Sequence, residues 1–150
     1  MAPITLTLPS DYGYVLLAAS STFFINTLHA VLTSKARKAS GIKYPVSYAS
    51  NDLAEKDRKA YLFNCAQRAH NNFTENLTPF LGSLLISGLQ YPKFAGALGG
   101  LWAFARVLFA LGYTSKGPEG RMIGSLIGSL TDFVLKFTAA YTAVGFALQW

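Results

Sequence analysis

The segment 63–79, FNCAQRAHNNFTENLTP, carries polar side chains at helical spacing, and its residue types are suited to binding a small charged molecule. On an α-helix, Asn64, Arg68, Asn72, Glu75 and Pro79 fall within a stripe about 80° wide. A guanidinium binds a carboxylate through paired hydrogen bonds, an amide donates and accepts, and a carboxylate accepts from an ammonium group. The stripe predicts either a site for a zwitterionic ligand or a hydrogen-bond network between helices that binds nothing.

Other candidate groups have simpler interpretations. Cys65 is the single cysteine, and we expect it to behave as a small buried hydrophobe. The two histidines, His29 and His70, have no carboxylate or second thiol at ligand spacing, so we predict no metal site. Asp132 and Lys136 are spaced i,i+4 and are expected to form an ion pair.

Arg106 interrupts an apolar stretch and needs a counter-charge, for which Glu75 and Asp132 are the candidates.

The composition indicates the kind of element that positions these groups. The chain has 150 residues, of which 51% are hydrophobic and 13% charged, and its mean hydropathy is +0.30. Soluble domains carry about 25% charged residues, so this chain is too apolar for one. It is also too apolar for a disordered segment, and a single cysteine excludes an internal disulfide. We predict an integral membrane protein.

Four apolar stretches are long enough to cross a bilayer. Residues 12–32 contain no Asp, Glu, Lys or Arg, and a helix of 21 residues spans about 30 Å. Further stretches lie at about 73–91, 94–113 and 122–148. The predicted fold is therefore all-α, an integral membrane four-helix bundle that forms one domain over residues 1–150.

The basic residues lie on one side of this predicted arrangement. The first and third loops hold ten Lys and Arg residues, whereas the segment between the second and third spans holds only Lys93. Because basic loops stay in the cytoplasm, both termini are expected on the opposite side. The net charge of +6 then indicates attraction to anionic membrane lipids. Nucleic-acid binding is excluded, because no basic face interleaved with aromatic residues or reader motif accompanies these charges.

The motif FNCAQRAHNNFTENLTPF resembles the second-helix signature of the membrane-associated proteins in eicosanoid and glutathione metabolism, the MAPEG family. Three other features are similar to the family: SKARKASGIKYPVSY after the first span, FARVLFALGY at the end of the third, and Arg121 at the start of the fourth. The resemblance covers nearly the whole chain, and the order of the motifs is that of the microsomal glutathione S-transferase type 3 branch.

The resemblance implies a homotrimer that binds glutathione between protomers near the cytoplasmic side. It assigns glutathione contacts to Arg68, Asn72, Glu75 and Tyr113, with Arg37 supplied by a neighbouring protomer and His70 as another polar contact. Arg121 matches the arginine that stabilises the thiolate and is the predicted catalytic residue. The predicted contacts also include Asn76, which stands where some relatives have a tyrosine. Phe109 likewise replaces a family tyrosine.

Helix geometry adds a constraint on His70. It lies about 200° around the helix from Arg68, so one bound tripeptide could hardly contact both residues of one protomer. If both bind glutathione, they serve different sites, and the helix is shared between protomers of an oligomer.

The implied activity is that of a glutathione S-transferase or glutathione-dependent peroxidase, with glutathione as co-substrate and no metal. The second substrate would be a lipophilic electrophile, conjugated as by leukotriene C4 synthase, or a lipid hydroperoxide. The alternatives are a non-catalytic lipid-binding accessory protein of the same family and a small channel subunit. The expected location is the endoplasmic reticulum membrane, with the outer mitochondrial membrane as the alternative.

Overall fold

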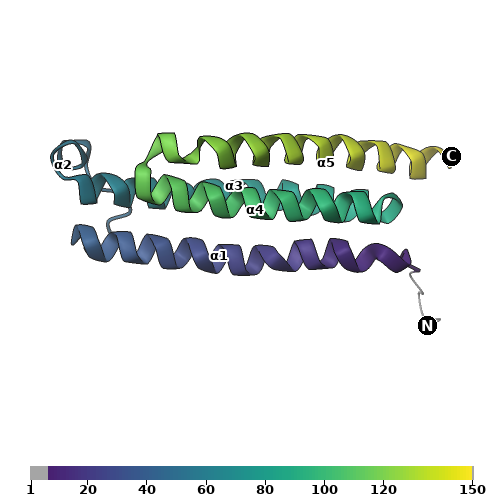
Figure 1. Ribbon diagram of the computed structural model, residues 1–150, viewed down its shortest axis with the longest axis horizontal. Coiled ribbons are helices and arrows are strands. Elements are labelled where there is room, and N and C mark those ends of the chain that lie inside the picture. The colour runs from purple at the N-terminus through teal and green to yellow at the C-terminus, as the bar shows by residue number, and fades with distance from the viewer. Residues whose placement is uncertain (1–6, 150) are drawn as a thin grey trace.

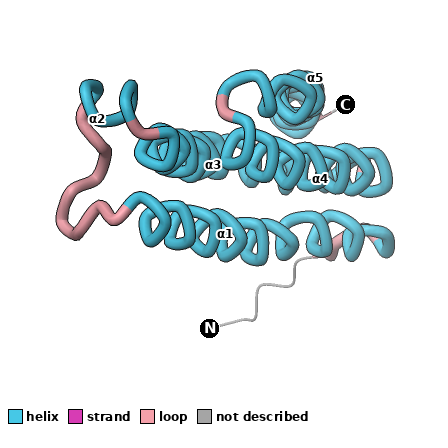
Figure 2. The backbone as a smooth tube through the Cα atoms, turned by 60° about the vertical axis from the view of Figure 1, so that its left-hand side comes forward, coloured by secondary structure: helices cyan, strands magenta, loops and turns pink. Residues whose placement is uncertain are grey.

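The computed structural model describes residues 7–149, which form an all-helical bundle (Figure 1). Four long helices run side by side: α1 (Gly13–Ser40), α3 (Arg58–Gln90), α4 (Pro92–Lys116) and α5 (Met122–Leu148). Between them are short elements, η1 (Ser10–Tyr12), α2 (Asn51–Lys56) and η2 (Pro118–Arg121). Figure 2 shows α1 and α5 on opposite sides of the antiparallel α3–α4 pair.

The helix boundaries follow local signals. Ser50 accepts a hydrogen bond from the Leu53 amide and caps α2, and Asp57 accepts one from the Lys59 amide and caps α3. Pro92 is placed at the first turn of α4, where its missing N–H costs nothing. Gly41 ends α1 with φ of 71°, a conformation that glycine adopts at little cost.

Helices α1, α4 and α5 are long and apolar enough to cross a membrane. Helix α3 carries the polar motif and is not among the spans identified by length and composition within the described residues. The predicted fourth span agrees with α5, whereas α1 and α3 extend beyond the predicted spans. Both extensions lie at the end of the bundle that also holds α2 and η2 (Figure 1). The two basic loops therefore lie at one end, as the charge pattern predicts.

Large aromatic side chains form the centre of the bundle. Phe80 of α3 stacks on Trp102 of α4 with ring centroids 3.7 Å apart, and Phe73 lies 6.0 Å from the same indole. Small residues allow close approach elsewhere: a Cβ at Gly124 would lie 2.5 Å from the Phe109 amide nitrogen. This contact fixes the distance between α4 and α5 at the end where the basic loops lie.

Candidate functional site

Two cavities lie towards the basic end of the bundle, and residues that line one contact a residue that lines the other. The larger, of about 820 Å³, is here named the rim cavity. Its polar lining comprises Tyr48, Asn51, Glu55, Lys56, Arg58, Tyr61, Asn64, Cys65, Arg68 and Tyr113. The smaller, of about 340 Å³, is named the inner cavity. Its polar lining comprises Asn72, Asn76, Arg106, Arg121, Ser125, Ser129, Asp132 and Lys136. Both are in the size range of small-molecule sites.

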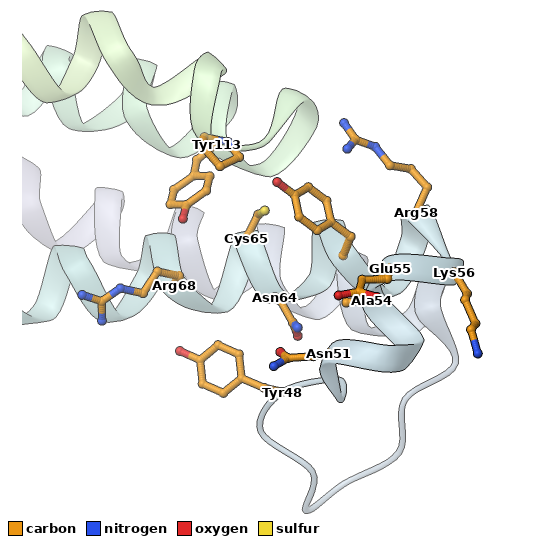
Figure 3. Close-up of a pocket in the computed structure, with 12 residues that line it drawn as sticks. Tyr48, Asn51, Ala54, Glu55, Lys56, Arg58, Asn64, Cys65, Arg68 and Tyr113 are labelled. Carbon is orange, nitrogen blue, oxygen red and sulfur yellow. The ribbon is translucent and has the colours of Figure 1, made fainter.

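The loop after α1 and helix α2 form one side of the rim cavity. Figure 3 shows Tyr113 of α4 on one side, Tyr48 and Asn51 on the other, and Asn64 and Cys65 of α3 between them. Asn64 exchanges two hydrogen bonds with Ala49, accepting from its amide at 2.8 Å and donating to its carbonyl at 3.0 Å. The side chain of Gln67 donates to the Ser47 carbonyl. The loop is thus held on α3 through its backbone.

Arg68 pairs with Glu75 two turns further along α3, with 2.9 Å between Nη1 and Oε1. The side chains are 50% and 51% exposed, so the pair is screened and is worth no more than about 1 kcal/mol. Such a pair can exchange partners with a ligand at little cost. This contact also removes Glu75 as the partner predicted for Arg106.

The inner cavity is built around Arg106. Its Nη2 atom donates to Oδ1 of Asn72 at 2.9 Å, and its guanidinium lies 4.5 Å from the Phe109 ring centroid. Asp132 lines the same cavity but forms its ion pair with Lys136, as the i,i+4 spacing predicts. An amide, and not a carboxylate, is therefore the hydrogen-bond partner of Arg106.

Arg121 and Tyr113 join the two cavities. Arg121 lines the inner cavity and Tyr113 the rim cavity, and the guanidinium lies 4.8 Å from the tyrosine ring centroid. On α3, Arg68 and Asn72 are one turn apart and face the rim and inner cavities respectively. The two cavities are therefore adjacent, with Arg121 in contact with Tyr113 and Arg68 one turn from Asn72 along α3.

Asn76 lines the inner cavity and donates to the backbone carbonyl of Asn72 at 2.7 Å. Phe109, which replaces a family tyrosine, lines it too and packs edge-on against Tyr113. The structure thus brings most of the predicted contacts to one region.

Arg37 and His70 lie elsewhere in the protomer. Arg37 is buried, donates to the Val46 carbonyl at 2.7 Å, and lies over the rings of Tyr44 and Phe63. His70 faces α1, where its Nε2 atom is 3.1 Å from the side-chain oxygen of Asn26. His70 and Arg68 thus use different sides of α3, as the helix geometry predicts.

Sequence reasoning did not place Arg106, Ser125, Ser129, Asp132 and Lys136 in the site. A signal was present: Arg106 is spaced i,i+7 from Tyr113, two turns apart on one face of α4. On α5, Ser125, Ser129, Asp132 and Lys136 recur at intervals of three or four, forming one polar face in an apolar helix.

Burial raises the pKa of the Cys65 thiol, and Tyr61 and Arg58 offset this only in part. A thiol that is protonated at neutral pH is a poor nucleophile. Cys65 is a free, buried cysteine, as expected. Among the described residues, no group of three or more His, Cys, Asp or Glu side chains is arranged to hold a metal ion.

A family model described as the MAPEG family matches residues 15–141. This chain belongs to the MAPEG family. The family includes glutathione transferases and peroxidases, and its members lie in membranes. The match includes all four long helices in whole or in large part, and both cavities lie within it.

Proposed function

We propose that this protein is a membrane glutathione transferase or peroxidase that ionises glutathione and delivers the thiolate to a lipophilic electrophile or lipid hydroperoxide. The observation that supports the proposal is the adjacency of the two cavities, with Arg68 and Tyr113 in the lining of one and Asn72 and Arg121 in that of the other, in a chain of the MAPEG family. The order of the sequence motifs favours the microsomal glutathione S-transferase type 3 branch.

Glutathione is held by groups that match its charges. Arg68 and Arg121 bind carboxylate groups or the thiolate, because a guanidinium offers paired donors to anions. Glu75 accepts from the ammonium group of the γ-glutamyl residue, which replaces the exposed contact between Glu75 and Arg68. Asn72 and Asn76 hydrogen-bond the peptide groups, and Arg106 orients Asn72.

The chemical step needs the thiolate. A free thiol titrates near 8.5, so most glutathione at neutral pH is protonated. A guanidinium beside the sulfur favours the anion and lowers the thiol's pKa. We assign this role to Arg121, since it lies at the junction of the cavities and its guanidinium keeps its charge.

The thiolate sulfur then attacks the electrophilic carbon. An epoxide opens to an alkoxide that takes a proton and gives a thioether conjugate. With a hydroperoxide, the thiolate attacks the terminal oxygen and the O–O bond breaks. The alkoxide that leaves takes a proton to become an alcohol, and the other product is the sulfenic acid of glutathione. A second glutathione reduces this species to glutathione disulfide and water.

In the membrane arrangement that we propose, the site lies at the cytoplasmic boundary. We propose that α3 crosses the bilayer together with the three apolar helices, because its aromatic residues pack along α4 through Phe73, Phe80 and Trp102. The basic end then faces the cytoplasm, where glutathione is abundant. The proposed compartment is the endoplasmic reticulum membrane.

The proposed assembly is a homotrimer. Arg37 and His70 line neither cavity in their own protomer, so we assign their predicted contacts with glutathione to a neighbouring copy. Mixing Arg68→Ala chains with His70→Ala chains tests this arrangement, because some mixed sites regain both residues. Activity above the sum of the two parents supports a shared site, and strictly additive activity contradicts it.

The decisive experiment uses the protein purified in detergent. Calorimetry measures glutathione binding, and turnover is followed with a chromogenic aryl halide and with a lipid hydroperoxide. Saturable binding with turnover of either substrate is the expected result. Binding of lipid without any saturable uptake of glutathione would instead fit the accessory-protein alternative and overturn the proposal.

A further inference from the structure

A groove between α1 and α4 lies towards the end of the bundle opposite the basic loops, where both helices begin (Figure 1). It has a volume of about 520 Å³ and is here named the outer groove. Its wall includes Tyr14 and Leu17 of α1 and Gly96, Ala97, Gly100 and Ala103 of α4. Tyr14 and Leu17 are 56% and 69% exposed, so the groove opens onto the outside of the protomer. None of these residues lines the rim or inner cavity.

Two glycines of α4 shape the outer groove. A Cβ added at Gly96 would lie 2.7 Å from the Tyr14 Cβ and 3.0 Å from its carbonyl carbon, so α1 and α4 touch there. A Cβ added at Gly100 would meet nothing within 4 Å, so the two helices leave open space beside it. The Ser21 hydroxyl in the wall donates to the Ala18 carbonyl at 2.6 Å. The groove therefore offers mainly hydrocarbon surface to an occupant.

The length of the outer groove matches one leaflet of a bilayer. Lys93 and Ala103 both line it and lie about 15 Å apart along α4, at a rise of roughly 1.5 Å per residue. The hydrocarbon core of a bilayer is about 30 Å thick, so each leaflet contributes about half of that. An acyl chain of a membrane lipid fits this dimension, with Lys93 at the depth of the lipid headgroup.

Lys93 also lines a second cavity, here named the end cavity, of about 280 Å³. In it the Lys93 Nζ atom lies 3.3 Å from Oδ2 of Asp11, and the two side chains are 74% and 39% exposed. Water screens such a pair, so both charges can exchange partners with a ligand. Residues 1–11 and 137–150 contain no Lys or Arg, so Lys93 supplies the positive charge here. A cation beside a carboxylate is complementary to a headgroup with a phosphate beside an ammonium group.

Aromatic rings in the end cavity favour one type of ammonium group. Tyr91 and Phe94 line this cavity together with Asp11, and Phe94 is 49% exposed. The faces of such rings attract quaternary ammonium groups, of which choline is the common example. A primary ammonium group has three N–H donors and gains more from hydrogen bonds to water. The rings therefore favour choline over ethanolamine.

We infer that the outer groove and the end cavity together bind a phosphatidylcholine molecule of the leaflet farther from the basic loops. Its acyl chain lies in the groove, its phosphate contacts Lys93, and its quaternary ammonium lies between Asp11 and the Phe94 ring. The occupant is amphipathic because the two charges stand at the end of an apolar channel. The inference concerns lipid binding and does not depend on the glutathione chemistry.

Native mass spectrometry of the full-length protein purified in detergent tests the inference. Phosphatidylcholine and phosphatidylethanolamine with identical acyl chains are titrated, and the dissociation constant of each lipid adduct is measured. The two lipids carry the same charges, so the basic loops affect both alike. We expect phosphatidylcholine to bind about fivefold more tightly, and Phe94→Leu to remove this preference without weakening phosphatidylethanolamine.

Variants separate the groove from the headgroup contacts. Gly100→Leu fills the outer groove and should weaken binding of both lipids at least about tenfold. Gly82→Leu is the matched control, because Gly82 is also exposed, has nothing within 4 Å of an added Cβ, and lines neither the groove nor the end cavity. Lys93→Met should weaken both lipids about fivefold through loss of the phosphate contact. Lys43→Met, in the loop after α1, should leave phosphatidylcholine binding unchanged.

Two results would overturn the inference directly: equal affinity for the two lipids, or a phosphatidylcholine affinity that Gly100→Leu does not alter. The same spectra give the mass of the assembly. A change of oligomeric state in Gly100→Leu with unchanged lipid binding would assign the groove to a contact between copies of the chain and would also overturn it. Calorimetry with glutathione tests the proposed function separately, so failure of one does not imply failure of the other.

Discussion

The rim cavity and the inner cavity lie side by side, yet their ion pairs differ in character. In the Arg68–Glu75 pair both side chains are about half exposed, whereas in the Asp132–Lys136 pair Lys136 is 47% and Asp132 only 12% exposed. Water screens the first pair, so a ligand can replace it at little cost. In the second pair the carboxylate is poorly hydrated, and removal of Lys136 leaves it uncompensated. The difference in hydration therefore makes the Arg68–Glu75 pair replaceable by a ligand, whereas the Asp132–Lys136 pair stays in place.

The largest effect is expected from Arg121, at the junction of the cavities. Arg121→Ala should lower kcat at least about a hundredfold, as loss of a group that stabilises developing anions commonly does. Glutathione affinity should change much less, because the other contacts remain. Arg68→Ala should reduce the affinity itself by about tenfold. Calorimetry and steady-state kinetics measure the two quantities.

Arg58→Ala is the matched control for these arginine variants. Arg58 lines the rim cavity but donates to the Lys116 carbonyl at its exposed end. A loss of turnover as large as that of Arg121→Ala would show that total positive charge, and not the position of Arg121, controls the reaction.

The next largest effect, a loss of stability, is expected from variants of the two ion pairs. Asp132→Asn should reduce the free energy of unfolding by about 2 kcal/mol, because it leaves Lys136 without a counter-charge at membrane depth. Glu75→Gln should cost less than about 1 kcal/mol. Thermal unfolding in one detergent compares both variants with the parent. Equal losses would remove the distinction drawn between the two pairs.

A smaller effect is expected from the glycines that set the spacing beside the inner cavity. Gly124→Ala should destabilise the protein by about 1–2 kcal/mol, because the added carbon would lie 2.6 Å from the Ala105 carbonyl oxygen. Gly100→Ala is the control: nothing lies within 4 Å of its added carbon, so higher helix propensity should make it neutral or slightly stabilising. The same unfolding measurement applies, and a stabilised Gly124→Ala variant would contradict the close α4–α5 contact.

The smallest effect concerns Cys65 in the rim cavity. Because burial raises the pKa of its thiol, the thiolate fraction at neutral pH is below that of a free cysteine. Alkylation by iodoacetamide should be severalfold slower than in the denatured chain and should accelerate only at a pH above the usual thiol range. Mass spectrometry of the intact protein follows the reaction. An alkylation rate equal to that of the denatured chain would show that the rim cavity does not bury this thiol.

Prediction from sequence was strongest where the signal is local. Helix α5 has the bounds of the fourth predicted apolar stretch, 122–148, and α4 begins at Pro92, two residues before the third predicted stretch. The extension of α3 back to Arg58 was not predicted, because charged residues end an apolar run without ending a helix. The Asp57 cap and the packing against α2 and the loop keep that part helical.

In the candidate site, too, features that depend on a single helix were predicted, whereas contacts between helices were not. The stripe on α3 was recognised because its members share one helix, and the Asp132–Lys136 pair because its spacing is i,i+4. Of the two alternative counter-charges predicted for Arg106, Glu75 binds Arg68 instead, and Asp132 lines the same cavity as Arg106 but pairs with Lys136. The hydrogen-bond partner of Arg106, Asn72, lies 34 residues away on another helix. Several polar residues are predicted at a similar depth in the membrane, and the sequence does not show which of them binds Arg106.

The amino-acid sequence by itself determined that the chain is helical and apolar enough for a membrane, which end holds the basic loops, and which polar residues share a helix face. These properties depend on composition and on the geometry of single helices. The tertiary structure decided that Arg121 meets Tyr113, that Arg106 binds Asn72, and that the polar face of α5 lines a cavity. Such contacts depend on how each helix is rotated against its neighbours, and many weak packing contacts from the whole chain set that rotation.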